Sequence, residues 1–142
     1  MHISPSLAKQ LKQAGLKWKP TLHDFFMVPD TALDDRVFVI ADMMAQYEIL
    51  RGDPAITFNG AVEWALDYVL MYDAIWMLTE AQVRTRLQRR LGANARFLLR
   101  LADTGYECEI MLSEEPLIFS APTAADAYGR ALLALLRYAK YK

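Results

Sequence analysis

The segment 96–112 constrains the fold most, because one pairing register satisfies both faces of a β-hairpin. The turn is predicted at Asp103-Thr104-Gly105, with Asp103 and Thr104 at the centre of the loop. In this register apolar side chains share one face, which we expect to be buried, and opposite charges share the other. The predicted register pairs Leu101 with Tyr106, Leu99 with Cys108, Phe97 with Ile110 and Arg100 with Glu107, and it places Arg96 diagonal to Glu109.

Two helices are predicted to flank the hairpin. Thr79 and Gln82 have the spacing of a capping box, and apolar residues at every fourth position continue the helix to about residue 91. A strand at 117–120 follows the hairpin, and Thr123 caps a final helix that runs almost to the end of the sequence. The segment 79–138 is therefore predicted to be an α-β-β-β-α unit.

The first half of the chain has weaker patterns. Ser4 and Pro5 fit the cap and the first position of a short helix over 5–14. A helical wheel groups the apolar residues of 61–70 on one side, which predicts an amphipathic helix there. Strands are predicted over 23–28, 36–41 and 74–78, in addition to 96–101, 106–112 and 117–120; 46–50 fits either a strand or a helix, and Gly52-Asp53-Pro54 is expected to break the chain before Ile56.

The composition fits one globular domain. The chain has 142 residues, of which 54% are hydrophobic and 23% charged, and this balance argues against disorder. We expect a single α+β domain over 1–142, with an antiparallel sheet packed against helices, and a possible division into 1–76 and 79–138. One cysteine excludes an internal disulfide framework and a multi-cysteine metal site.

The net charge of −1 argues against a bulk binder of nucleic acid or of anionic membranes. The charges are unevenly distributed: residues 1–76 hold 6 basic and 10 acidic side chains, and the remainder holds 10 and 7. This uneven distribution of charge can guide self-association, because the acidic part of one copy attracts the basic part of another. The N-terminus lacks the features of a signal peptide, and charges interrupt every apolar segment, so we expect a cytoplasmic protein without membrane insertion.

Four residues are candidates for partner binding. Arg86, Arg89 and Arg90 share a sector of roughly 100° on the predicted helix 79–91. Trp64 lies at the border of the apolar face of the predicted helix 61–70, where an exposed tryptophan can anchor a partner. These positions predict a non-enzymatic interaction or regulatory module that binds a protein partner or a second copy of itself.

Nucleic-acid binding through the same arginines is the first alternative. The α-β-β-β-α order resembles that of double-stranded-RNA-binding domains, which contact phosphates through lysines at the start of the last helix. Here that position reads Pro122-Thr123-Ala124-Ala125-Asp126, and its carboxylate opposes phosphate docking. Nucleic acid is therefore the less favoured partner.

A small hydrolase or metal enzyme is the second alternative. Glu63 and Asp67 have the i, i+4 spacing of paired helix carboxylates, which can hold a metal or support acid–base chemistry. His23 and Asp24 are adjacent, so in a strand they point to opposite faces. Cys108 falls on the buried face of the hairpin and is not expected to be a nucleophile. Phosphate-binding loops and local catalytic motifs are absent from the sequence, and we expect no cofactor.

Several stretches resemble known proteins. LKQAGLKWKP, DDRVFVIADM, TFNGAVEWALDYVL and IWMLTEAQVRTRL resemble a set of small uncharacterised bacterial proteins, some of which carry a pilus-assembly label. The C-terminal third, ending in FSAPTAADAYGRALLALL, is similar to small α-β-β-β-α sandwich domains of phage-related proteins. The resemblance implies a bacterial protein and brings no functional residues with it. The phosphate loops of pilus-assembly ATPases are absent, which argues against an energy-coupling role.

Overall fold

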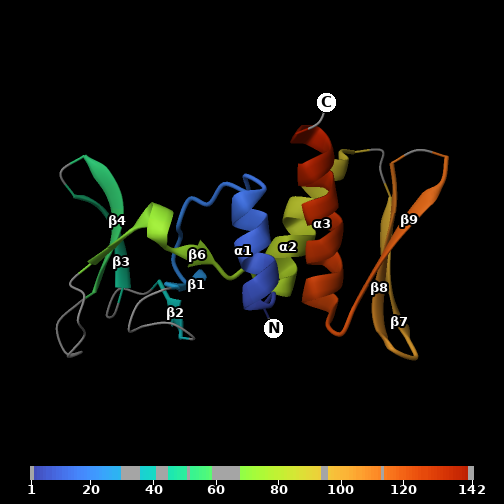
Figure 1. Ribbon diagram of the computed structural model, residues 1–142, viewed down its shortest axis with the longest axis horizontal. Helices are drawn as coiled ribbons and strands as arrows, with labels where there is room; N and C mark the ends of the chain where they lie inside the picture. The colour runs from blue at the N-terminus through green and yellow to red at the C-terminus, as the bar shows by residue number, and fades with distance from the viewer. Residues whose placement is uncertain are drawn as a thin grey trace. The chain divides into compact units, whose positions relative to one another are not determined.

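The computed structural model shows a mixed α+β fold with antiparallel strands (Figure 1). It describes residues 2–29, 36–40, 45–50, 52–58, 68–93, 96–112 and 114–140. The helices are α1 (Pro5–Gln13), α2 (Glu80–Leu91) and α3 (Ala124–Lys140), with a 3-10 helix η1 at Met71–Asp73. The strands are β1 (Phe25–Met27), β2 (Val37–Val39), β3 (Ala45–Leu50), β4 (Asp53–Phe58), β5 (Tyr68–Leu70), β6 (Ile75–Trp76), β7 (Phe97–Ala102), β8 (Gly105–Met111) and β9 (Pro116–Ala121). Within the described residues they form three antiparallel sheets, in the orders β2-β1-β6, β3-β4-β5 and β7-β8-β9.

By its packing the chain divides into two compact units. The terminal unit combines Met1–Leu16 with Leu78–Lys142, and the central unit is Lys17–Met77. Helix α1 therefore groups with the C-terminal elements, although the whole central unit lies between them in the sequence. Two hydrogen bonds support this grouping: the amide of Ile3 donates to the backbone carbonyl of Leu78, and the amide of Ser4 donates to the side-chain carboxylate of Asp126 on α3.

Helix α3 is the centre of the terminal unit. It packs against α1 and α2 on one side and against β8 and β9 on the other, as Figure 1 shows. A helix that is covered on several sides needs apolar residues around much of its circumference, and α3 has them. Its buried side chains are Ala125, Ala127, Tyr128, Ala131, Leu132, Leu133, Leu135 and Leu136.

The hairpin register predicted from the sequence is confirmed. All four predicted pairings of β7 with β8, from Phe97↔Ile110 to Leu101↔Tyr106, are present, and β9 joins β8 as the third strand. Cys108 and Ile110 are fully buried, as the two-faced pattern requires. Leu101 differs from expectation: it lies on the same face as Phe97 but is 73% exposed, because α3 packs mainly against β8 and β9.

Helix α2 begins with the predicted capping box. The Thr79 hydroxyl accepts from the Gln82 amide, and the Gln82 side chain accepts from the Thr79 amide. Val83 and Leu87 are fully buried, and Leu91 at the end of the stripe is partly exposed. The apolar stripe of α2 is therefore narrow, which matters for the groove described below.

The central unit has its own apolar core. Phe26, Val28, Ile40 and Ile56 are buried together with Ala74, and Trp18, Phe38 and Met71 pack against them. The rings of Trp18 and Trp76 stack with their centroids 6.0 Å apart. The buried Asp24 carboxylate accepts from the Trp18 indole N–H at 2.9 Å and from the Thr21 amide at 3.0 Å. Asp24 thereby fixes the loop that leads into β1.

Several predictions for the central unit were wrong. The last three residues of the predicted helix 61–70 form strand β5 instead, since Tyr68–Leu70 pairs with β4, and aromatic and β-branched residues favour strands. Residues 61–67 of this prediction lie outside the described part of the chain. Asp53 and Pro54 lie within β4, and the turn that precedes them contains Gly52 at a φ of 89°.

The ambiguous segment 46–50 is part of strand β3, because it pairs with β4 along its whole length. His23 lies in a turn at a φ of 74°, not in a strand. In the described part of the chain, no helix has the length and apolar character that crossing a membrane requires.

A candidate binding groove between α2 and β7

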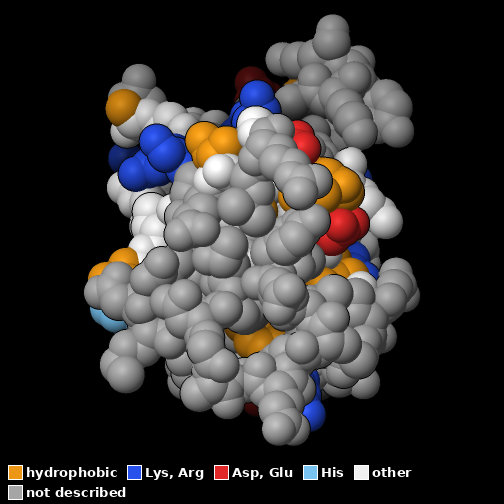
Figure 2. All heavy atoms as spheres, turned by 90° about the vertical axis from the view of Figure 1, so that its left-hand side faces the viewer, with side chains coloured by type: hydrophobic (Ala, Val, Ile, Leu, Met, Phe, Trp, Pro, Cys, Tyr) orange, Lys and Arg blue, Asp and Glu red, His pale blue; other side chains and the backbone are white. Residues whose placement is uncertain are grey.

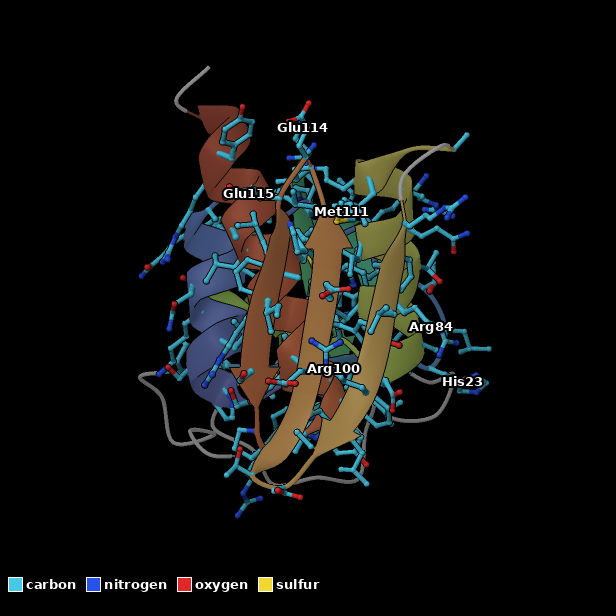
Figure 3. The ribbon with its side chains drawn as sticks, turned by 90° about the vertical axis from the view of Figure 1, so that its right-hand side faces the viewer. His23, Arg84, Arg100, Met111, Glu114 and Glu115 are labelled. Atoms are coloured by element: carbon cyan, nitrogen blue, oxygen red, sulfur yellow. The ribbon has the colours of Figure 1, made fainter. Side chains whose placement is uncertain are left out.

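A groove of about 860 Å³ lies between the C-terminal half of α2 and the first residues of β7. Figure 3 shows α2 beside the edge of β7, with Met111 at the end of the neighbouring strand β8. The groove has an apolar part and a polar part. The apolar part comprises Phe97, Leu98 and Met111, and the helix contributes Thr85, Gln88 and Arg89.

The groove exists because α2 does not pack on the sheet. Its narrow buried stripe, Val83 and Leu87, serves the contact of α2 with α3. Helix α3 in turn packs against β8 and β9 much more than against β7. The space between α2 and the edge of β7 is therefore left without a covering element of the described chain.

Two arginines make the groove basic. Arg89 lines it from α2, and Arg96 lines it from the residue before β7. The ion pairs of the described residues do not include either guanidinium. Glu109 also lines the groove, but its carboxylate lies 3.7 Å from the Arg100 guanidinium, so its charge is shared with another cation.

This distribution corrects the predicted role of Arg96. The sequence predicted that Arg96 and Arg100 would be neutralised by Glu107 and Glu109, but Arg100 takes both carboxylates. Its nitrogen Nε lies 2.8 Å from Glu107, and this hydrogen bond is the main reason why the pKa of Arg100 is raised. Arg96 is opposite Met111, whose amide donates to the Arg96 carbonyl at 3.3 Å. The absence of a directly opposite carboxylate in the register was the sequence signal for a free Arg96.

The three candidate arginines of α2 have different surroundings. Arg86 is half-buried and has interaction partners of its own. Arg89 and Arg90 are exposed, and Arg89 is the one that lines the groove. The fourth arginine of the helix, Arg84, interacts with the Tyr128 side chain, whose pKa is raised mainly by burial. The structure therefore brings together Arg89 and Arg96, a pair that the sequence pattern did not group.

Three other candidates lie outside the described residues. They are Trp64, the proposed partner anchor, and the carboxylates Glu63 and Asp67. In the part of the chain that the structure describes, no group of three or more potential metal ligands was found.

The remaining candidate groups have structural surroundings. Burial raises the pKa of the Cys108 thiol to about 11, so that little thiolate forms near neutral pH. His23 is exposed, while the adjacent Asp24 is buried and engaged with Trp18 and Thr21.

In the groove, the Thr85 hydroxyl donates to the carbonyl of Ala81 at 2.9 Å. The groove is thus lined by groups suited to binding anions and apolar side chains.

Exposed apolar side chains gather on the β7-β8-β9 sheet. Leu98 and Ile118, on either side of Glu109, are each nearly half exposed on the face that points away from α3. By contrast, on the described part of the face in Figure 2, hydrophobic side chains lie in separate small patches between charged groups. The terminal unit therefore carries both the groove and a partly apolar sheet surface.

Comparisons with known proteins found no relative. A scan against protein-family models gave no match, and searches of curated proteins and of solved structures gave none.

Proposed function

We propose that this chain is a cytoplasmic, non-enzymatic protein-binding module, and that its groove takes an acidic segment of a partner protein. The observation that carries the proposal is the pair Arg89 and Arg96, which line an apolar groove without a carboxylate partner in the described structure. A partner carboxylate placed there gains charge-assisted hydrogen bonds, which are the stronger kind.

The charge of the whole terminal unit supports an acidic partner. Residues 1–16 and 78–142 hold 12 basic and 7 acidic side chains, a net charge of +5. The central unit holds 4 basic and 10 acidic side chains, a net charge of −6. The basic unit attracts negatively charged partners over several ångströms and raises the rate at which they associate.

The apolar part of the groove supports a protein partner over a simple anion. Phe97, Leu98 and Met111 offer contact area to apolar side chains next to the two guanidinium groups. Arginines, aromatic residues and methionines are the types enriched at protein interfaces. A segment that alternates acidic and apolar residues matches both parts of the groove.

A selection experiment tests this proposal. Random peptides of about ten residues, displayed on phage, are selected against the full chain, and the affinity of the enriched sequences is measured by fluorescence anisotropy. We expect acidic and apolar residues to be enriched. The double variant Arg89→Glu, Arg96→Glu should weaken binding by about tenfold or more.

The double variant Lys9→Glu, Arg137→Glu is the matched control, because it makes the same charge change at two exposed residues outside the groove. It should change the affinity by less than about twofold. If no acidic peptide is enriched, or if both charge reversals weaken binding equally, the groove is not the binding site. An RNA duplex of about 16 base pairs is tested in parallel, and its binding in place of peptides would favour the nucleic-acid alternative.

A further inference from the structure

We infer that the acidic segment binds in extended form, as a fourth strand along the open edge of β7. This inference rests on the proposed function, because it specifies how the same groove takes its partner. It follows from the hydrogen bonds of the sheet, from the difference between its two edges and from the position of the groove.

The edge of β7 has a row of unused backbone groups. The two-residue turn makes Ala102 and Gly105 a hydrogen-bonded pair. The Met111 amide donates to the carbonyl of Arg96, which precedes Ala102 by six residues, so Arg96 and Met111 are a hydrogen-bonded pair too. In an antiparallel ladder, hydrogen-bonded pairs alternate with pairs that are not hydrogen-bonded. The N–H and C=O groups of Phe97, Leu99 and Leu101 therefore point away from β8, and among the described strands none pairs with β7 along that edge.

The opposite edge of the sheet is less open. By the same alternation, the groups of β9 that point away from β8 belong to Pro116, Ile118 and Ser120. Pro116 has no N–H group to donate. The carbonyl of Ser120 already accepts from the guanidinium of Arg130 on α3. The edge of β9 is thus partly blocked, and the edge of β7 is the one that can accept a strand.

The groove supplies the side-chain contacts for a strand on this edge. Phe97 and Leu98 belong both to the edge strand and to the groove wall. Side chains of an added strand would point alternately to the inner face of the sheet, beside Phe97, and to its outer face, beside Leu98, and both of these residues line the groove. Leu101, 73% exposed at the far end of β7, would be covered by the same strand. Arg89 and Arg96 lie at the groove end, so an acidic residue is required there.

Charge argues for a foreign acidic strand over a second copy. Pairing of β7 with β7 of another molecule would bring together two terminal units, each with a net charge of +5. Like charges at this distance repel, whereas an acidic segment is attracted. Strand addition to an open edge combines main-chain hydrogen bonds, which give affinity, with alternate side-chain pockets, which give specificity.

Amide hydrogen exchange tests the geometry directly. An acidic peptide from the display selection is added to the full chain at saturation, and exchange is followed residue by residue by NMR. We expect the exchange rate of the Leu99 amide, which faces the open edge, to fall by about tenfold or more when the peptide binds. The Arg100 amide, which faces β8, should change little.

Methylation of the peptide backbone is a second test that requires no protein variant. N-methyl groups are placed at each peptide position in turn. A strand bonded along one side should lose about tenfold or more in affinity at every second position and less than about threefold at the positions between. Uniform sensitivity, or none, would show that the peptide binds through side chains alone.

Proline variants provide a matched comparison of the two edges. Leu101→Pro removes an outward N–H group of β7, and Ile118→Pro removes one of β9, without loss of a predicted ladder hydrogen bond in either case. Only Leu101→Pro should weaken peptide binding. Equal effects of the two proline variants would overturn the inference. So would protection of the Leu99 amide that rises with protein concentration in the absence of peptide, because it would indicate that a second copy of the chain occupies the edge. If peptides bind with charge selectivity but without these signatures, strand addition fails while the proposed function stands. If no peptide binds, both fail.

Discussion

The Cys108 thiol lies in the buried face of the β7–β8 hairpin, and burial raises its pKa from 9.0 to about 11. The thiolate is the reactive form, so native Cys108 should resist a thiol reagent such as a disulfide dye at about pH 8. The unfolded chain should react fully. Labelling with and without urea checks this expectation, and rapid reaction of the native protein would contradict the burial of this residue.

The same pKa shift predicts how stability depends on pH. Between about pH 9 and pH 11 the unfolded thiol loses its proton while the folded thiol keeps it, so the folded state binds more protons. The free energy of unfolding therefore falls as the pH rises through this range, by about 1.4 kcal/mol at pH 10 from this group. Urea unfolding of the wild type and of Cys108→Ala at pH 7 and pH 10 isolates the contribution. Equal pH dependence of the two proteins would refute it.

Asp24 is a buried carboxylate whose role is to hold the loop before β1. Asp24→Ala leaves the partly buried donors, the Trp18 indole N–H and the Thr21 amide, without their acceptor, and loss of hydrogen bonds to a charged group is costly. We expect a loss of about 3 kcal/mol in unfolding free energy. Asp53→Ala, at an exposed carboxylate of the same unit, should cost less than about 0.5 kcal/mol. Similar values for the two variants in urea unfolding would show that Asp24 is dispensable.

At the scale of elements, a substitution at the start of α2 tests the contribution of the capping box to stability. Thr79→Ala removes the hydroxyl that accepts from the Gln82 amide and should cost about 1 kcal/mol. Thr85→Ala is the matched control, because Thr85 is exposed in the middle of the same helix and alanine favours helix more. Its unfolding free energy should stay equal or rise slightly. A control that loses as much as the cap variant would contradict the assignment.

An element could be predicted from the sequence where several independent patterns in its residues indicated the same structure. The β7–β8 register was predictable because charge pairs on one face and apolar pairs on the other agreed. Strand β5 was not, because Tyr68–Leu70 has apolar residues that fit a helical wheel as well as a strand, and only the neighbouring β4 decides. Pro54 misled in the same way: proline favours breaks, yet strands also tolerate it where its missing N–H is not needed.

The groove was outside the reach of sequence patterns for a different reason. It results from a contact that is not made, between α2 and the sheet, while α3 occupies the neighbouring position. Periodicity identifies the buried stripe of α2 at Val83 and Leu87 but not the element that will cover it. Arg89 was recognised as part of an exposed face, whereas Arg96 was assigned to an ion pair. Their proximity depends on the tertiary fold.

At the scale of the whole molecule, folding separates charge more strongly than the linear sequence suggests. A cut after Trp76 leaves net charges of −4 and +3, whereas the packed units carry −6 and +5. The difference comes from the N-terminal segment, because Lys9 and Lys12 of α1 fold with the basic terminal unit. A sequence-based domain boundary misses this exchange, since it assigns residues by their order in the chain.

The two units offer separate native probes of unfolding. Trp18, Trp64 and Trp76 all belong to the central unit, and the single thiol, Cys108, belongs to the terminal unit. Leu87→Ala removes a fully buried side chain of the terminal unit and should cost about 2–5 kcal/mol there.

We expect this variant to shift the urea midpoint of Cys108 labelling to lower concentration, while the midpoint of tryptophan fluorescence moves little. The reason is that the described residues of the core around Phe26 and Ile56 all belong to the central unit. The reciprocal variant Ile56→Ala should shift the fluorescence midpoint and spare the labelling curve. If each variant moves both curves equally, the units unfold as one cooperative structure and the contacts within each unit do not suffice to describe its stability.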